Sequence, residues 1–169
     1  MTWTVAEGSK GRRWREAVTD ARGVRHSLLF ETGPDRRFSH MELASAAGLL
    51  TLHPEGDATL HGNLVDGTGV RHIVGLPWDR DAVVDLAGSA ITAAAAAWLL
   101  DRAPGAREDG IEVAVLRISA HLELEVAATT VTPVGDASWR AADGTTFAAG
   151  RDGLPVLDAA AEWPLEQDS

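Results

Sequence analysis

One helix-forming segment with strand-like patterns on both sides limits what this chain can fold into. The segment begins at Gly88-Ser89, and Ser89 is the predicted N-cap because its hydroxyl can accept a hydrogen bond from a free N–H of the first turn. Residues 93–97 are all alanine, the residue with the highest helix propensity. Residues 103–105, Ala-Pro-Gly, are predicted to end the helix.

The predicted helix carries an apolar stripe. Ile91, Ala95 and Trp98 recur at helical spacing, and Leu99 lies beside them. Because alanine has little side-chain bulk, another part of the chain can approach this helix closely. The pattern predicts a helix that is packed against the rest of the protein.

Short segments in which apolar and polar residues alternate predict strands on both sides of the helix. Turns rich in Gly, Pro and Asp separate them. Before the helix, the predicted strands are residues 14–18, 24–30, 38–46, 48–53, 58–65, 70–75 and 82–86, and the segment 38–46 also has the composition of a short helix. After the helix, they are residues 111–118, 122–126, 137–141 and 145–149, with residues 154–157 closing the chain.

Residues 58–75 form the clearest predicted hairpin, with two possible registers. A two-residue turn would pair Val65 with Thr68, and a four-residue loop would pair Val65 with Val70. Both registers give the hairpin one apolar face and one polar face. The polar face carries His61, Asn63 and His72, and the apolar face carries Leu60, Leu64 and Ile73.

The alternation changes phase at Ser119-Ala120, within residues 111–126. Apolar residues occupy odd positions before that point and even positions after it. A hairpin in which Leu124 pairs with Val115 gives such a change, and so does one long strand with a bulge. The sequence leaves both structures open.

About ten strands with one helix predict a mostly β (α+β) fold. We expect a curved antiparallel sheet, or partial β-barrel, with the Ala-rich helix packed on its concave face. Residues 1–12 are expected to be a loose N-terminal lead-in, and residues 13–165 a single β-rich domain.

Composition excludes several classes of function. The net charge of −10 disfavours binding to nucleic acid, and the absence of cysteine excludes disulfides and thiolate chemistry. The longest apolar run, residues 93–100, is too short to span a membrane. The polar N-terminus lacks the apolar core of a secretory signal, so we expect a cytoplasmic protein. Cofactor-binding and nucleophile motifs are also missing from the sequence, so no cofactor is expected.

The tryptophans are the first candidate ligand-binding residues. Trp14, Trp78 and Trp98, together with Trp139, can frame a pocket for an acyl chain or an aromatic ligand, since they are large and the helix opposite them is small. The same residues are equally typical of a tightly packed core.

Charged and polar candidates lie near the helix. Asp85 interrupts an apolar strand, and if it faces inward it needs a partner such as Arg102 or Arg71. Asp79 and Asp81 can form a cation site with it, although loop solvation is the commoner role. His61 and His72 can hold a metal only with a third ligand, such as Asp85 or His40, so hydrogen-bonded strand histidines are the default interpretation.

Three stretches carry a resemblance to a known family. The tail, with Trp139-Arg140 and residues 146–149 and 151–157, resembles the closing segment of a bacterial family named for glycolipid binding, whose function is uncharacterised. Residues 82–100 are similar to its central Asp-Val-Asp-Leu core, with alanines and Trp98 where that family has Thr-Asn-Thr-Leu-Pro and two arginines. Residues 115–126 are similar to its paired strands. The resemblance implies a half-barrel around a helix, as in lipoprotein carriers, with a hydrophobic ligand cavity.

The sequence supports three hypotheses for function. The first is a non-catalytic binding protein that holds a small hydrophobic or amphipathic molecule, lipid-like or glycolipid-like, between sheet and helix. Its expected ligand-binding residues are Trp78, Trp98, Asp85, His72 and Trp14. The second is a hydrolase or isomerase that uses His72 or His61 with Asp85 as an acid–base pair. The third is a homodimer formed through an exposed sheet edge.

Overall fold

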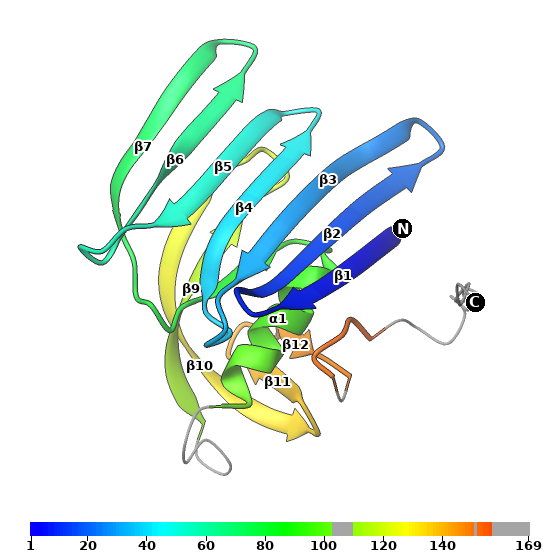
Figure 1. Cartoon of the computed structure of the whole chain (residues 1–169), viewed down its shortest axis with the longest axis vertical. Coiled ribbons are helices and arrows are strands. Elements are labelled where there is room, and N and C mark those ends of the chain that lie inside the picture. The colour runs from blue at the N-terminus through cyan, green and yellow to red at the C-terminus, as the bar shows by residue number, and fades with distance from the viewer. Residues whose placement is uncertain (103–109, 151, 157–169) are drawn as a thin grey trace.

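The first 77 residues form seven consecutive antiparallel strands, and buried and exposed positions alternate along several of them, such as β2, β4 and β6. A computed structural model describes residues 1–102, 110–150 and 152–156. Each strand pairs with the next along the chain, so the sheet is a meander in the order β1-β2-β3-β4-β5-β6-β7 (Figure 1). The strands are β1 Thr2–Gly8, β2 Gly11–Asp20, β3 Gly23–Thr32, β4 Phe38–Ser45, β5 Gly48–Pro54, β6 Thr59–Asp66 and β7 Gly69–Pro77.

The expected loose lead-in at residues 1–12 is wrong. Strand β1 pairs with β2 over its whole length, from Thr2 opposite Ala17 to Gly8 opposite Gly11. Trp3 and Val5 point to the same face and pack against the core. Their spacing of two residues is the strand signal that the polar composition of this segment hides.

Two of the ambiguous segments are now decided. Residues 38–46 form strand β4 and not a helix. In the β6–β7 hairpin, Val65 pairs with Val70 and Asp66 with Gly69, so the second of the two predicted registers is the one adopted. A register shift follows between Leu60 and Gly62.

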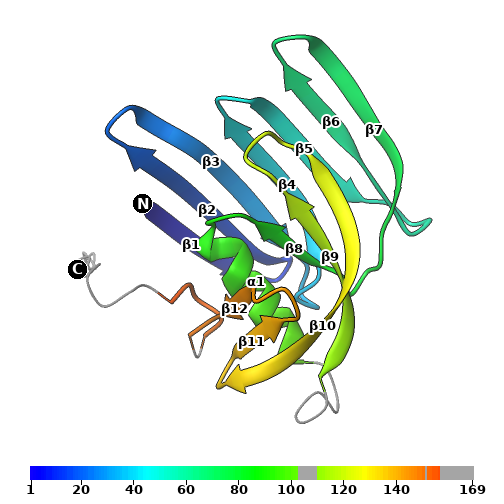
Figure 2. The same cartoon turned by 180° about the vertical axis from the view of Figure 1, so that it is seen from behind.

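The remaining strands form a second sheet in the order β12-β11-β10-β9-β8 (Figure 2). These strands are β8 Val83–Leu86, β9 Ile111–Ile118, β10 Leu124–Gly135, β11 Ser138–Ala141 and β12 Thr146–Ala148. All neighbouring pairs are antiparallel except β8 and β9, which run parallel. Helix α1, Ala90–Leu100, lies in the connection between them, as parallel pairing requires a crossover. The predicted mostly β fold with one helix is confirmed.

The phase change at Ser119-Ala120 marks a hairpin. Residues 119–123 connect β9 to β10, and Leu124 pairs with Ile118. The predicted pairing of Leu124 with Val115 is therefore wrong, because the connection is longer than a tight turn. Leu122 lies within it, buried and with a positive φ of 61°.

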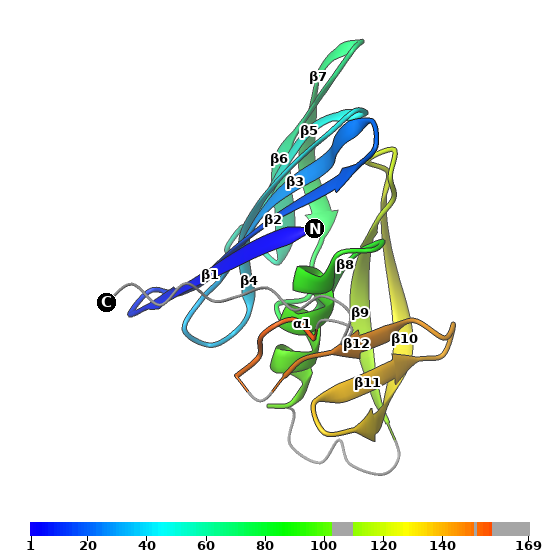
Figure 3. The same ribbon diagram turned by 90° about the vertical axis from the view of Figure 1, so that its right-hand side faces the viewer.

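Helix α1 begins as predicted and is buried on more than one side. The Ser89 side chain accepts a hydrogen bond from the Thr92 N–H, which confirms the N-cap. Ala94 through Ala97 are all buried. In Figure 3 the helix lies between the two sheets, and it contacts β8, β12, β11 and β2. The predicted stop at residues 103–105 lies outside the described residues.

A row of aromatic rings crosses the core between the first sheet and the helix. It runs Trp98, Trp14, Phe30, Phe38 and Trp78, and successive ring centroids lie 5.3–5.9 Å apart. Leucines of β3 to β6 and the inward side chains of β8 and β9 complete this core. Among the described residues, no helix is long and apolar enough to cross a membrane.

Candidate functional site

A buried carboxylate lies where strand β2 meets the first turn of α1. The Glu16 side chain is fully buried. Its Oε1 lies 2.9 Å from Nε2 of His26, and its Oε2 accepts a 3.4 Å hydrogen bond from the Ile91 N–H. Ile91 belongs to the first turn, where backbone N–H groups have no partner within the helix. A helix N-terminus also carries partial positive charge, so it is a favourable place for a carboxylate.

Strand alternation explains why Glu16 is inside. Along β2, Arg12, Trp14 and Glu16 occupy the positions that face the helix, and all three are buried. His26 lies on β3, where it pairs with Val18, two residues beyond Glu16 on the same face. Burial of an unpaired charge is very costly. The contacts with His26 and Ile91 supply the partners that a buried Glu16 side chain needs.

His26 lines a cavity of about 170 Å³. Residues of the first sheet, of the segment between β8 and α1, and of the β9–β10 connection line this cavity. The apolar lining residues include Leu43, Leu86 and Leu122. The polar lining residues include Arg25, His26 and Ser45. The remaining lining residues are Val18, Ala87, Gly88, Ser119 and Ala120. The cavity is therefore amphipathic.

The sequence prediction missed this site, although a signal for it was present. In the predicted strand 14–18, Trp14, Glu16 and Val18 share a face, so an acidic residue interrupts an apolar row. Pairing this strand with residues 24–30 brings Glu16 close to His26.

Two of the predicted ligand-binding residues, Trp14 and Trp98, do come together. Their ring centroids lie 5.9 Å apart at an angle of 81°. Trp14 is fully buried. The Arg12 guanidinium carbon lies 4.0 Å from the Trp98 ring centroid and that of Arg36 lies 4.5 Å from it. A Cβ added at Gly153 would lie 2.6 Å from two atoms of the ring. The protein's own groups therefore surround Trp98.

The space between the helix and the first sheet is largely filled. A cavity of about 10 Å³ remains beside Phe30, Thr32 and Ala95. That volume is close to the smallest that holds one water molecule. The space in which the sequence predicted a ligand is thus occupied by side chains.

Trp78 lies at the other end of the aromatic row. Its ring centroid is 5.5 Å from that of Phe38, and its backbone N–H donates a hydrogen bond to the Ala58 carbonyl. It borders an open surface groove with Asp79 and Arg80. The rings of Trp78 and Trp98 lie at opposite ends of the row and do not contact each other.

Asp85 has a different partner from those predicted. It pairs in register with Arg117 of β9, and neither Arg102 nor Arg71 contacts it. Burial raises the pKa of Asp85, and the charge of Arg117 opposes that rise. Arg117 itself donates a hydrogen bond to Asp143. These groups form a polar cluster on β8, β9 and the β11–β12 turn.

His72 lies on exposed β7, where its Nδ1 is 2.7 Å from the Asn63 Oδ1. Asp85 belongs to the other sheet, so the predicted His–Asp pair is not assembled. His61 pairs across the sheet with His53. The described residues contain no group of three or more His, Asp or Glu side chains able to hold a metal.

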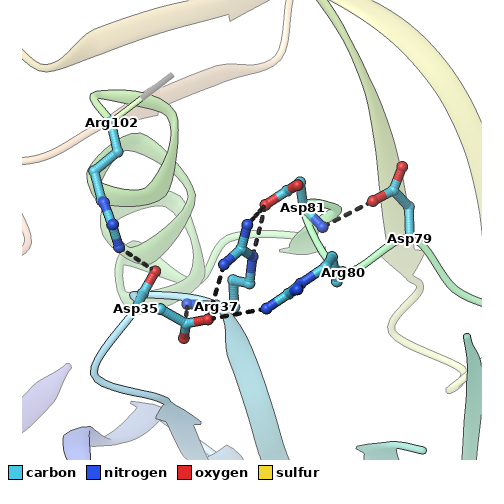
Figure 4. Close-up of polar contacts among 6 residues, drawn as sticks. All are labelled: Asp35, Arg37, Asp79, Arg80, Asp81 and Arg102. Atoms are coloured by element: carbon cyan, nitrogen blue, oxygen red, sulfur yellow. Dashed lines mark hydrogen bonds and ion pairs between the residues drawn. The ribbon is translucent and has the colours of Figure 1, made fainter. Parts of the chain in front are cut away.

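Asp79 and Asp81 belong to an ionic network that joins two loops (Figure 4). The Arg37 guanidinium bridges Asp35 at 2.9 Å and Asp81 at 2.7 Å. The hydrogen bonds that Arg37 donates to these two carboxylates raise the pKa of Arg37 above its usual value. Asp79 accepts from the Asp81 N–H at 2.8 Å, which is turn chemistry. The three aspartates do not gather into a cation site, because Asp85 lies in its own cluster.

Comparisons with known proteins give one likeness. No family model matches the chain, and no curated protein matches it. A crystal structure of a DUF1089 family protein from Pseudomonas aeruginosa, at 1.80 Å resolution, is similar with a TM-score of 0.57 and 16% sequence identity. The match covers 99% of this chain and 91% of the other. At this identity the likeness shows the fold alone.

Proposed function

We propose that the protein binds a small amphipathic molecule in the cavity at the N-terminal end of α1. The observation that carries this proposal is that His26, held by buried Glu16, lines a cavity together with several leucines. Binding sites for small molecules combine apolar surface with a few oriented polar groups. The polar end of a ligand would contact His26 and Arg25, and its apolar end would contact Leu86 and Leu122.

The volume limits the ligand. The volume of about 170 Å³ is well above the minimum of about 10–15 Å³ that holds one water molecule. Pockets for drug-sized molecules are larger, about 300–1,000 Å³. We therefore expect a molecule of a few carbon atoms, or one end of a longer amphipathic chain. A glycolipid, the ligand implied by the family resemblance, could place only one end in this cavity.

The proposal differs from the sequence hypothesis in location. The sequence placed the ligand between the tryptophans and the helix, where side chains now fill the space. The cavity lies at the end of the helix, between the tips of the two sheets. Asp85 and His72 do not line it.

Native mass spectrometry of the protein purified from cells tests the proposal. We expect a bound organic molecule that is released on denaturation. Ala120 is exposed and lines the cavity, so Ala120→Trp should fill the cavity and abolish the adduct without disturbing the core. Ala142→Trp, in the exposed β11–β12 turn, is the matched control and should retain the adduct. An adduct that survives Ala120→Trp would contradict this location.

The same spectra at rising concentration test the homodimer hypothesis, which stays a prediction.

A further inference from the structure

We propose that Ser45, His26 and Glu16 form a nucleophile–base–orienter series that cleaves a small carboxylic ester in this cavity. The inference rests on the proposed binding site and adds a reaction to it. Ser45 and His26 are the catalytic residues, and Glu16 is a positioning residue.

Register places the hydroxyl beside the imidazole. Ser45 of β4 and His26 of β3 are direct partners across the strands, and both line the cavity. Directly opposite side chains have Cβ atoms about 4.5–5.5 Å apart, so the Ser45 hydroxyl and the His26 ring are close neighbours on one face of the sheet. Glu16, on β2, contacts the ring from the other side. His26 thus lies between a carboxylate and a hydroxyl.

The hydrogen-bonding capacities of the three groups are complementary. Glu16 engages Nε2 of His26, so Nδ1 is the ring nitrogen left to accept a proton from Ser45. The Ser45 Oγ accepts a 3.1 Å hydrogen bond from the Ala47 N–H. That contact uses a lone pair of the oxygen and leaves its hydrogen free to be donated to Nδ1. A base oriented by a third group, with a hydroxyl in reach, is the general arrangement of an activated nucleophile.

The reaction balances without a cofactor. The Ser45 Oγ attacks the ester carbonyl carbon while His26 Nδ1 takes the hydroxyl proton. The C–O bond to the leaving alcohol breaks, and His26 returns the proton to that alcohol. Water then attacks the acyl-serine and loses a proton to His26, the acyl C–Oγ bond breaks, and His26 returns the proton to Ser45 Oγ as the acid leaves. Arg25 also lines the cavity and adds positive charge near the developing oxyanion.

The cavity sets the substrate class. Leu43, Leu86 and Leu122 suit an alkyl group, and the volume of about 170 Å³ limits it to a short chain. Arg25 lines the cavity, and its pairing with Asp20 is long at 4.0 Å, so its guanidinium remains able to bind another group. A short-chain acyl ester fits these conditions better than a long-chain lipid.

Ser119 is a second serine that lines the cavity. Its hydroxyl accepts from the His121 and Glu123 N–H groups and donates to the Glu123 carboxylate. Both its oxygen and its hydrogen are already engaged. It is therefore a serine of the same cavity without the proposed activation.

The experiment uses the full chain with p-nitrophenyl acetate and butyrate as substrates and a fluorophosphonate as a covalent probe. We expect turnover, and a probe adduct that peptide mapping places on Ser45. Ser45→Ala should lose the adduct and lower kcat by about 10²-fold or more. Ser27→Ala changes an exposed serine of β3 that does not line the cavity, so it should retain both. His40→Ala removes an exposed histidine and controls for hydrolysis by surface imidazoles. Circular dichroism confirms that each variant is folded.

Glu16→Gln tests whether Glu16 orients His26 for catalysis or only stabilises the fold. It should lower kcat with little change in KM and alter the pH dependence of kcat, because the imidazole loses its anionic partner. An adduct on Ser119, or full activity in Ser45→Ala, would overturn the inference. If a cellular ligand is bound but neither ester nor probe reacts, the binding proposal stands and the catalytic inference fails. If no ligand binds and nothing reacts, both fail.

Discussion

The Oε2 atom of Glu16 lies 3.4 Å from the backbone nitrogen of Ile91, so strand β2 and helix α1 share a hydrogen bond across 75 positions of sequence. This contact joins the meander to the helix of the second sheet. The same carboxylate holds His26 at the wall of the cavity.

Replacing Glu16 should destabilise the protein. Glu16→Ala leaves a buried N–H of the helix and the His26 ring without their acceptor, and such losses cost about 1–3 kcal/mol. Urea unfolding at pH 7 measures the change. Glu16→Gln keeps one acceptor oxygen and should cost less. Equal costs for both variants would mean that the acceptor oxygen retained in Glu16→Gln contributes nothing to stability.

Gly153 should tolerate no side chain. A Cβ there would lie 2.6 Å from the Trp98 ring, and its φ is +68°. We expect Gly153→Ala to cost about 1–3 kcal/mol in thermal unfolding, the usual range for overpacking. Gly144→Ala is the control, because Gly144 also has a positive φ (+91°) but open space around its Cβ position. The difference between the two variants isolates the steric contact with Trp98.

The Asp85 carboxyl should make stability rise as the pH falls. Burial raises its pKa in the folded protein above the unfolded value, so the folded state takes up a proton first. The cost of the buried charge is present at neutral pH and disappears as the pH falls through the folded pKa. Asp85→Asn should therefore be more stable than the parent protein at pH 7, by less than about 1 kcal/mol because solvent screens the half-exposed group. Parallel urea titrations at pH 7 and pH 3 should show the difference closing at the lower pH.

The ability of the Arg37 guanidinium to bind two carboxylates at once should contribute more to stability than its positive charge alone. The guanidinium reaches Asp35 and Asp81 at once, which a lysine ammonium cannot reproduce in the same geometry. Arg37→Lys should lose about 0.5–1 kcal/mol, with the loss shrinking at high salt. Arg80→Lys, whose single contact to Asp35 is 3.5 Å long, should be nearly neutral.

Local patterns predict local structure well in this chain. Period-two alternation identified most strands, and Ser89 before an alanine run identified the helix start. The β9–β10 register could not be derived, because the length of the connecting loop decides it and alternation does not. The parallel pairing of β8 with β9 depends on where the helix packs, which no local pattern encodes.

The site shows the same limit. The sequence predicted that Trp14 and Trp98 frame a ligand pocket, but it did not reveal that the two rings pack together or that Arg12, Arg36 and Gly153 occupy the space around the Trp98 ring. Asp85 needed a partner, and its identity followed from strand register. Glu16 and His26 were individually unremarkable residues whose pairing depends on how β2 aligns with β3.

The parallel crossover β8–α1–β9 has a consequence for the order of folding. Every pairing in the first sheet joins strands adjacent in sequence, so it closes only short loops, and its hairpins can form quickly. Strand β8 can pair with β9 only after the chain has passed through α1 and returned, a slower non-local event. We therefore expect refolding in two kinetic steps. The hydrogen bond between Glu16 and Ile91 can form only in the second, because one partner belongs to each part.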